Sequence, residues 1–171
     1  GAALAAATTI VLFPALAIGA APFLGLSALS VITFFGALLA AILIFKLARH
    51  HKRTNVATML LGGIAINALA GALTGLLTYL ADDAALRSLT FWTLGSVGGA
   101  NWTTTLIVFI CCSISFGFLI RHYKSFNALS LGENEAAHLG IPVERLKKEV
   151  IVFVSLAVGC SVAFCGMIGF I

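Results

Sequence analysis

The sequence predicts an all-α, polytopic membrane protein, and three observations support this prediction. Of the 171 residues, 61% are hydrophobic and only 9% are charged, whereas about a quarter of an ordinary soluble domain is charged. The ten basic and six acidic residues gather in three clusters, which long uncharged runs separate. Several of these runs reach the roughly 20 residues that a membrane-spanning helix needs. The composition therefore excludes both a soluble globule and a disordered chain, since each would need more charge.

We expect five membrane-spanning helices, at about residues 2–20, 28–47, 56–80, 103–121 and 146–171. Residues 1–45 carry no charge, and we place the break between the first two spans near Ala21–Gly25, where proline and glycine interrupt the run. Pro14 lies inside the first span, where a kink is expected. Because the chain begins and ends inside apolar runs, we expect it to be part of a longer protein.

The basic residues orient these spans. Four of them lie between positions 46 and 53, and more follow two spans later, from Arg121 to Lys124. Positively charged loops stay in the cytoplasm, and an even number of crossings places both regions there. The connection 82–100 then lies on the outer side, where Tyr79, Trp92 and Trp102 would form an interfacial aromatic belt.

The outer connection is expected to contain a short helix that ends near Leu94. Asp82 or Asp83 can cap its first turn. Arg87 follows four or five residues later, which permits an ion pair with Asp83 along the helix. The alternative is that Arg87 is an exposed charge that docks a soluble partner.

The span at 56–80 contains one strongly polar side chain, that of Asn67. An unsatisfied amide is costly in hydrocarbon, so Asn67 should face protein or a water-filled path. Thr74 lies near the same face, and Gly71 and Gly75 form a G-x-x-x-G pair that permits close helix packing. Helix packing and pathway lining both remain open for these residues.

The cytoplasmic segment 125–145 is expected to contain a short helix with both ends marked. Ser130 and Glu133 match a capping box, while Gly140 and the following Pro142 match a helix stop. The expected apolar side of this helix comprises Leu131, Ala136 and Leu139. The segment is either a plain amphipathic connector or a docking helix for a cytoplasmic partner. Its length favours docking, because links between helices usually take about 2–8 residues.

The sequence contains no pattern for catalysis, for metal binding or for ATP binding. The four cysteines lie in apolar runs without a C-x-x-C pair, so we interpret them as small buried hydrophobic residues. The four histidines lack the i,i+4 spacing of a helical metal site, and a phosphate-binding G-x-x-x-x-G-K-[ST] loop is missing. The basic residues sit beside apolar runs, which argues against nucleic-acid binding. We therefore expect a non-enzyme without a cofactor of its own.

The cytoplasmic segment reads Leu129-x-Leu131-Gly132-Glu133-x-x-Ala136-x-x-Leu139-Gly140, and this pattern resembles the cytoplasmic loop of FecCD-type ABC importer permeases. These permeases import iron-siderophores, haem or vitamin B12. Residues 62–69 resemble the fifth helix of the family, residues 81–96 the segment after it, and residues 166–171 a stretch inside its seventh helix. Met167 departs from the pattern, because the family more often has proline there.

The resemblance implies that the five spans are the third to seventh of about ten helices in a bacterial inner-membrane protein. It also implies a homodimer, two cytoplasmic ATPase subunits that hydrolyse the ATP, and a periplasmic substrate-binding protein that docks near Arg87. The residues that would couple to the ATPase are Gly132, Glu133, Ala136, Leu139 and Gly140. Residues 67–71 and 89–95 look most like haem permeases.

Without the family resemblance, the residues also permit two other functions. A secondary transporter usually needs ionisable groups inside the membrane for ion coupling, and the five expected spans have none in their central parts. The third possibility is a membrane scaffold subunit that transports nothing.

Overall fold

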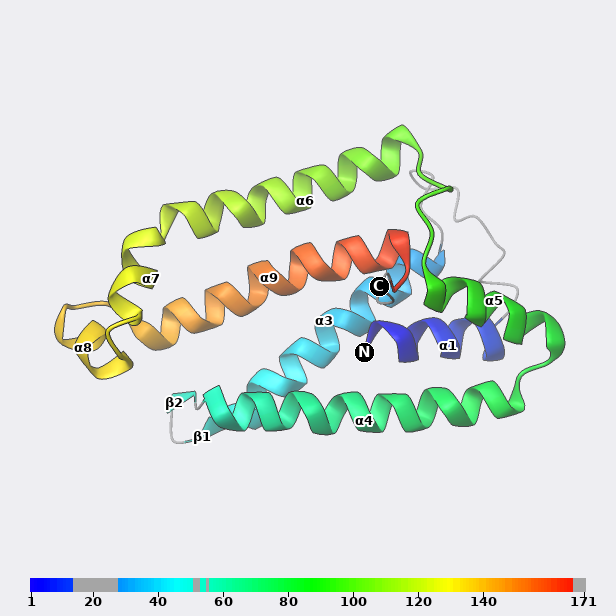
Figure 1. Cartoon of the computed structure of the whole chain (residues 1–171), viewed down its shortest axis with the longest axis horizontal. Helices are drawn as coiled ribbons and strands as arrows, with labels where there is room; N and C mark the ends of the chain where they lie inside the picture. The colour runs from blue at the N-terminus through cyan, green and yellow to red at the C-terminus, as the bar shows by residue number, and fades with distance from the viewer. Residues whose placement is uncertain (14–27, 51–52, 55, 168–171) are drawn as a thin grey trace.

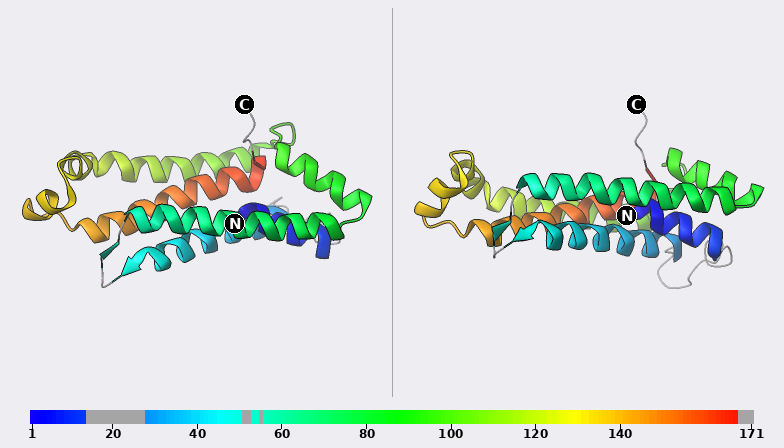
Figure 2. Two further views of the ribbon diagram at one scale, coloured as in Figure 1. Left: turned by 60° about the horizontal axis from the view of Figure 1, so that its bottom comes forward. Right: turned by 90° about the horizontal axis from the view of Figure 1, so that it is seen from below.

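The computed structural model describes residues 1–13, 28–50, 53–54 and 56–167. It is a layered bundle of helices (Figures 1 and 2). Four of these helices are long and apolar enough to cross a membrane, and at 1.5 Å per residue each is about 30 Å long or more. They are α3 (Ala28–Ala48), α4 (Val56–Leu80), α6 (Trp102–Arg121) and α9 (Val143–Cys165). The predicted fold class, an all-α polytopic membrane protein, is confirmed.

The first expected span corresponds only in part to α1 (Ala2–Leu12). The rest of that span, with Pro14 and the break at Ala21–Gly25, lies outside the described residues. Alanines let α1 approach α3 closely, since a Cβ atom added to Gly36 would collide with the side chain of Ala5. Further along, α1 contributes Ala7 and Ile10 to a small buried core that they share with one leucine of α5.

A hairpin of two very short strands joins α3 to α4. Arg49–His50 form β1 and Arg53–Thr54 form β2, and the two strands pair antiparallel. This hairpin was not predicted. It is a local reversal of the chain at the end of two helices and leaves the helical architecture unchanged.

The outer connection contains α5 (Asp83–Leu94), and its cap is the predicted one. The Asp82 carboxylate accepts a hydrogen bond of 2.8 Å from the backbone N–H of Ala85. The expected ion pair between Asp83 and Arg87 is wrong: every ion pair found among the described residues lies between positions 133 and 149. Both side chains are exposed to solvent, where such a pair gains little.

The last expected span is shorter than predicted, because α9 ends at Cys165. Gly166 follows with a φ of 73°, which favours glycine. Two backbone hydrogen bonds then tie this end to the end of α5. Ser96 N–H donates to the Cys165 carbonyl at 2.8 Å, and Met167 N–H donates to the Trp92 carbonyl at 3.3 Å. Residues 168–171 are outside the described part of the chain.

Helices α6 and α9 lie side by side through most of their length (Figure 1). The Ser115 hydroxyl donates 2.9 Å hydrogen bonds to the carbonyl oxygens of Cys111 on its own helix and Phe153 on α9. Phe118 stacks on Phe153 with 4.1 Å between ring centroids. The four cysteines are free thiols, of which Cys160 is buried and the others half-buried.

The helices place the charged clusters at opposite ends of the bundle. The hairpin, α7 (Tyr123–Leu129), α8 (Glu133–His138) and the start of α9 lie at one end, and α5 lies at the other (Figure 1). The two basic regions therefore share one end, and by the positive-inside rule this is the cytoplasmic end. Between the two ends, large apolar side chains remain exposed on α3, α4 and α6, as expected of surfaces that meet lipid or further protein.

Candidate cytoplasmic docking site

Two short helices, α7 and α8, occupy the cytoplasmic segment where one capped helix was predicted. The predicted capping box is wrong. The Ser130 hydroxyl donates a hydrogen bond of 2.7 Å to the Asn127 carbonyl at the end of α7, and it accepts none from the first turn of α8. Gly132 is the residue that precedes α8, and no side chain caps this helix. The Glu133 carboxylate binds a lysine of α9 instead of a backbone N–H.

Gly132 turns the chain into α8 with a backbone conformation that only glycine adopts readily. Its φ is 119° and its ψ is 152°, a region that is strained for any residue with a Cβ atom. A Cβ atom there would meet nothing within 4 Å. The backbone conformation, and not lack of space, is therefore what requires glycine at the start of α8.

Gly140 ends α8 as the sequence predicted. Its φ is 81°, and two backbone hydrogen bonds close the helix end. Ile141 N–H donates to the Ala136 carbonyl at 3.1 Å, and Gly140 N–H donates to the Ala137 carbonyl at 3.0 Å. This pair of bonds is a Schellman motif, which satisfies the last carbonyl groups of a helix. Because both ends are defined by glycine conformations, the position of α8 along the chain is fixed.

The expected apolar side of α8 is wrong. Ala136 is fully buried, whereas Leu131 is 69% and Leu139 65% exposed. The alanine therefore anchors the helix, while the two leucines stay uncovered at the end of the protein that meets the cytoplasm. An open hollow of about 450 Å³ lies between α8 and the start of α9, lined by residues that include Asn134, Ala137 and Arg145. Exposed large apolar side chains such as these two leucines are typical of a surface that binds another protein.

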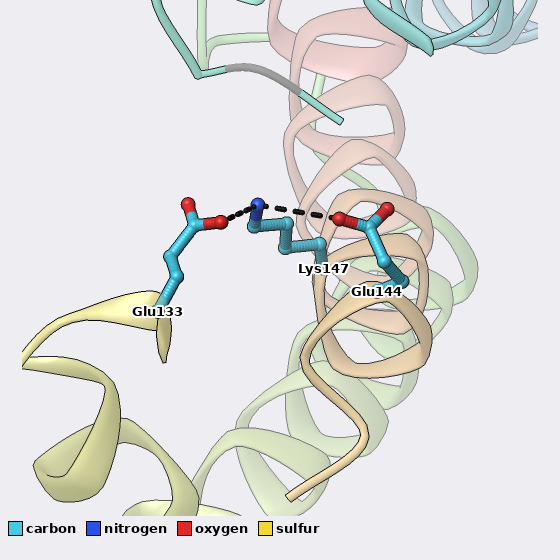
Figure 3. Close-up of polar contacts among 3 residues, drawn as sticks. All are labelled: Glu133, Glu144 and Lys147. Atoms are coloured by element: carbon cyan, nitrogen blue, oxygen red, sulfur yellow. Dashed lines mark hydrogen bonds and ion pairs between the residues drawn. The ribbon is translucent and has the colours of Figure 1, made fainter. Parts of the chain in front are cut away.

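Lys147 connects α8 to the transmembrane helix α9 (Figure 3). Its ammonium lies 2.6 Å from a carboxylate oxygen of Glu133 and 3.6 Å from one of Glu144. The lysine side chain is only 10% exposed, and that of Glu133 is 50% exposed. Sequence analysis missed Lys147. The Glu144–Lys147 spacing was visible as an i,i+3 pair, but Glu133 is 14 residues away in the chain and comes close only through folding.

The other predicted site residues lie away from this end. Arg87 is exposed on α5, at the outer end. Asn67 is exposed near the middle of α4, and Cβ atoms at Gly71 and Gly75 would meet nothing within 4 Å. The Thr74 hydroxyl donates to the Ala70 carbonyl of its own helix at 2.7 Å. No described helix packs on this face of α4 at the two glycines, so neither packing nor pathway lining is tested.

Metal-ligand geometry is not found in the described part of the chain, where no three His, Cys, Asp or Glu side chains gather closely enough to hold an ion. Three structural features stand out instead. They are four apolar helices, a short helix fixed by glycines at one end, and an ion pair that ties that helix to a membrane span. This combination defines a multi-pass membrane protein.

Residues 1–171 match the FecCD transport family over their whole length, and the chain belongs to this family. It is 40% identical over 152 residues to the hemin transport system permease protein HmuU of Yersinia pestis. The matched stretch covers 88% of this chain and 45% of that protein. It is 37% identical over 136 residues to the vitamin B12 import system permease protein BtuC of Vibrio cholerae, with 80% and 40% covered.

A solved structure also resembles the chain in three dimensions. It is an inward-facing conformation of a metal-chelate type ABC transporter, with a TM-score of 0.75 and 26% identity, over 97% of this chain and 50% of that one. The chain thus spans half or less of the length of these relatives. It is a multi-pass membrane protein of a transport-permease family, as the sequence predicted.

Proposed function

We propose that the chain belongs to the membrane subunit of an ABC importer that moves an iron chelate, haem or cobalamin across the inner membrane. In this proposal a separate cytoplasmic subunit hydrolyses the ATP, and the chain itself is no enzyme. Membership of the FecCD transport family supports the transport role. The observation that carries the ATPase docking is α8, a helix held between Gly132 and Gly140 and tied to α9 by Lys147.

The proposed coupling follows the contacts of α8. Glu133 is the first residue of α8, and its ion pair passes a displacement of that helix to Lys147 in the second turn of α9. From Lys147 to the end of α9 at Cys165 the helix continues for 18 residues, so it carries this displacement over about 27 Å. At its outer end it is hydrogen-bonded to the end of α5 through Trp92 and Ser96. ATP binding can drive this movement only if the ATPase binds one position of α8 more tightly than the other.

The docking proposal is tested by adding bulk to the exposed side of α8. The test uses the full-length protein, reconstituted with its ATPase subunit in proteoliposomes. Ala137→Trp adds a large side chain beside the hollow, whereas Asn127→Trp adds the same side chain to an exposed position of α7. We expect the Ala137 variant to lose most substrate-stimulated ATP hydrolysis and the Asn127 variant to keep it. Equal activity in the two variants would refute docking at α8.

We further propose that Arg87 docks the periplasmic substrate-binding protein and that a second copy of the permease completes a homodimer. Arg87 is exposed at the end opposite α8, where a partner outside the cytoplasm would approach. For α4 we propose that Asn67, Gly71, Thr74 and Gly75 are covered by protein outside this chain or line a water-filled path. The supporting observation is that the exposed Asn67 amide sits in the middle of a span, where contact with lipid would cost free energy.

The substrate is proposed from the relatives. One is a hemin transport protein and another imports vitamin B12. We favour haem, because the identity to the hemin permease is higher and extends further along the chain. Competition uptake with haem, cobalamin and a ferric siderophore distinguishes the three. An ion-coupled transporter is the alternative, and it would show uptake that collapses with the proton gradient while ATP is still present.

A further inference from the structure

A second hollow lies at the cytoplasmic end, between α3 and α9. These two helices diverge toward the end that carries α8 (Figure 1), and the hollow between them measures about 360 Å³. Its walls are apolar apart from Ser155, and a lysine from each helix lines its mouth. The lining residues on which the argument rests are Leu38, Ile42 and Lys46 of α3, and Lys148, Ile151 and Ser155 of α9.

The two lysines at the mouth are not neutralised by neighbouring acids. Lys46 is the single charged residue of α3. In the first turns of α9 the acidic groups are engaged by other cations, since Arg145 lies 2.9 Å from Glu149 and Lys147 contacts Glu133 and Glu144. Among the described residues, neither Lys46 nor Lys148 takes part in an ion pair. Two uncompensated ammonium groups at one opening attract an anion.

The apolar walls extend over most of the depth of one membrane leaflet. Leu38 lies eight residues before Lys46, and Ser155 lies seven residues after Lys148. At 1.5 Å per residue the walls extend about 10–12 Å from the lysines toward the centre of the membrane. Half of the hydrocarbon core is about 15 Å thick. The lysines therefore lie near the level of lipid headgroups, with the hollow beneath them among the acyl chains.

We propose that this hollow binds an anionic phospholipid of the cytoplasmic leaflet. Its phosphate lies between the ammonium groups of Lys46 and Lys148, and one acyl chain occupies the groove between α3 and α9. A free phosphate would satisfy the lysines but would leave the apolar walls empty. A zwitterionic lipid would fill the walls but would contribute less charge. The bound lipid joins α3 to α9 within one residue of Lys147, and it does so independently of any cytoplasmic partner.

The test uses the full-length protein, stripped of lipid in detergent and then titrated with phosphatidylglycerol or phosphatidylcholine under native mass spectrometry. The double variant Lys46→Gln/Lys148→Gln removes both charges at the mouth. Lys124→Gln is the matched control, because Lys124 is exposed at the same end but does not line the hollow. We expect the double variant to lose about 30-fold of the preference for phosphatidylglycerol, from the contribution of two lysines near a membrane surface. The control should keep it.

Three outcomes would overturn the proposal. One is an unchanged lipid preference in the double variant, and another is an equal loss in Lys124→Gln. The third is complete displacement of phosphatidylglycerol by inorganic phosphate. A second measurement reports whether a lipid chain enters the hollow. Val152→Trp places an indole in its wall, and brominated phosphatidylglycerol should quench it more than brominated phosphatidylcholine. Absence of quenching would mean that another segment of the full-length protein fills the groove.

Discussion

The ion pair between Lys147 and Glu133 offers the sharpest test of how α8 is held. Lys147→Gln removes a hydrogen bond of 2.6 Å whose donor is 10% exposed and whose acceptor is 50% exposed. A hydrogen bond to a charged group contributes about 1.5–3 kcal/mol when it is well shielded, and an exposed ion pair about 0–1 kcal/mol. Water can reach half of the Glu133 carboxylate in the variant, so we expect a loss of about 1–1.5 kcal/mol, between these limits.

The assay is hydrogen exchange of the α8 amides in the full-length protein. A loss of this size corresponds to roughly a 5–12-fold faster exchange, if α8 opens locally. In a double-mutant cycle with Glu133→Gln, the interaction energy between the two side chains should account for most of the loss seen in Lys147→Gln. Transport per ATP hydrolysed, measured in proteoliposomes, should fall in parallel, because α8 then moves without α9.

Arg145→Gln is the matched control for this experiment. It breaks an ion pair of 2.9 Å on the same helix, but Arg145 is 79% exposed and its partner Glu149 lies on α9 itself. Such a pair contributes about 0.2–0.5 kcal/mol, so hydrogen exchange of the α8 amides should stay near its original value. Equal effects of the Lys147 and Arg145 changes would refute the role of Lys147 as the link between α8 and α9.

Three further predictions concern the two ends of the bundle. Gly132→Ala should destabilise the start of α8 by about 1–3 kcal/mol, because φ is positive there. Gly117→Ala is the control: a Cβ atom there also meets open space, but the residue lies inside a helix, so the change should be neutral or stabilising. Local hydrogen exchange measures both variants. Asp82→Ala should lower the unfolding free energy by about 1 kcal/mol through loss of the α5 cap, and Asp83→Ala, which removes no cap, should have a smaller effect in thermal unfolding. Arg87→Glu should weaken docking of the substrate-binding protein severalfold at low salt, with the difference vanishing at high salt; an unchanged affinity at low salt would exclude Arg87 from that interface.

Much of the architecture followed from the sequence, because the membrane imposes a simple rule. A span must be apolar over its whole length and must satisfy its own backbone hydrogen bonds, so uncharged runs predict helices directly. The expected span at 103–121 corresponds to Trp102–Arg121, and the one at 56–80 to Val56–Leu80. The Asp82 cap and the Gly140 stop were also visible, because each depends on contacts within four or five residues.

The failures occurred where a local pattern had a competitor nearby in space. Ser130 had the correct spacing for a capping box, but it belongs to the end of α7, where its hydroxyl donates to the Asn127 carbonyl, and α8 begins only after Gly132. The carboxylate of Glu133 is bound by Lys147, far along the chain. Helical spacing placed Ala136 and Leu139 on one side of a helix, yet a helix of six residues is too short for periodicity to decide burial.

The sequence by itself determined that the chain is a membrane protein and where most of its spans lie, and its basic residues predict which end faces the cytoplasm. These properties depend on the free energy of transferring each residue between water and lipid, which is a property of the residue and its close neighbours. Only the tertiary structure decided which charges meet. It paired Lys147 with Glu133 and left Lys46 and Lys148 together at the mouth of a hollow. Ion pairs and hollows depend on distances between separate helices, and helix packing sets these distances.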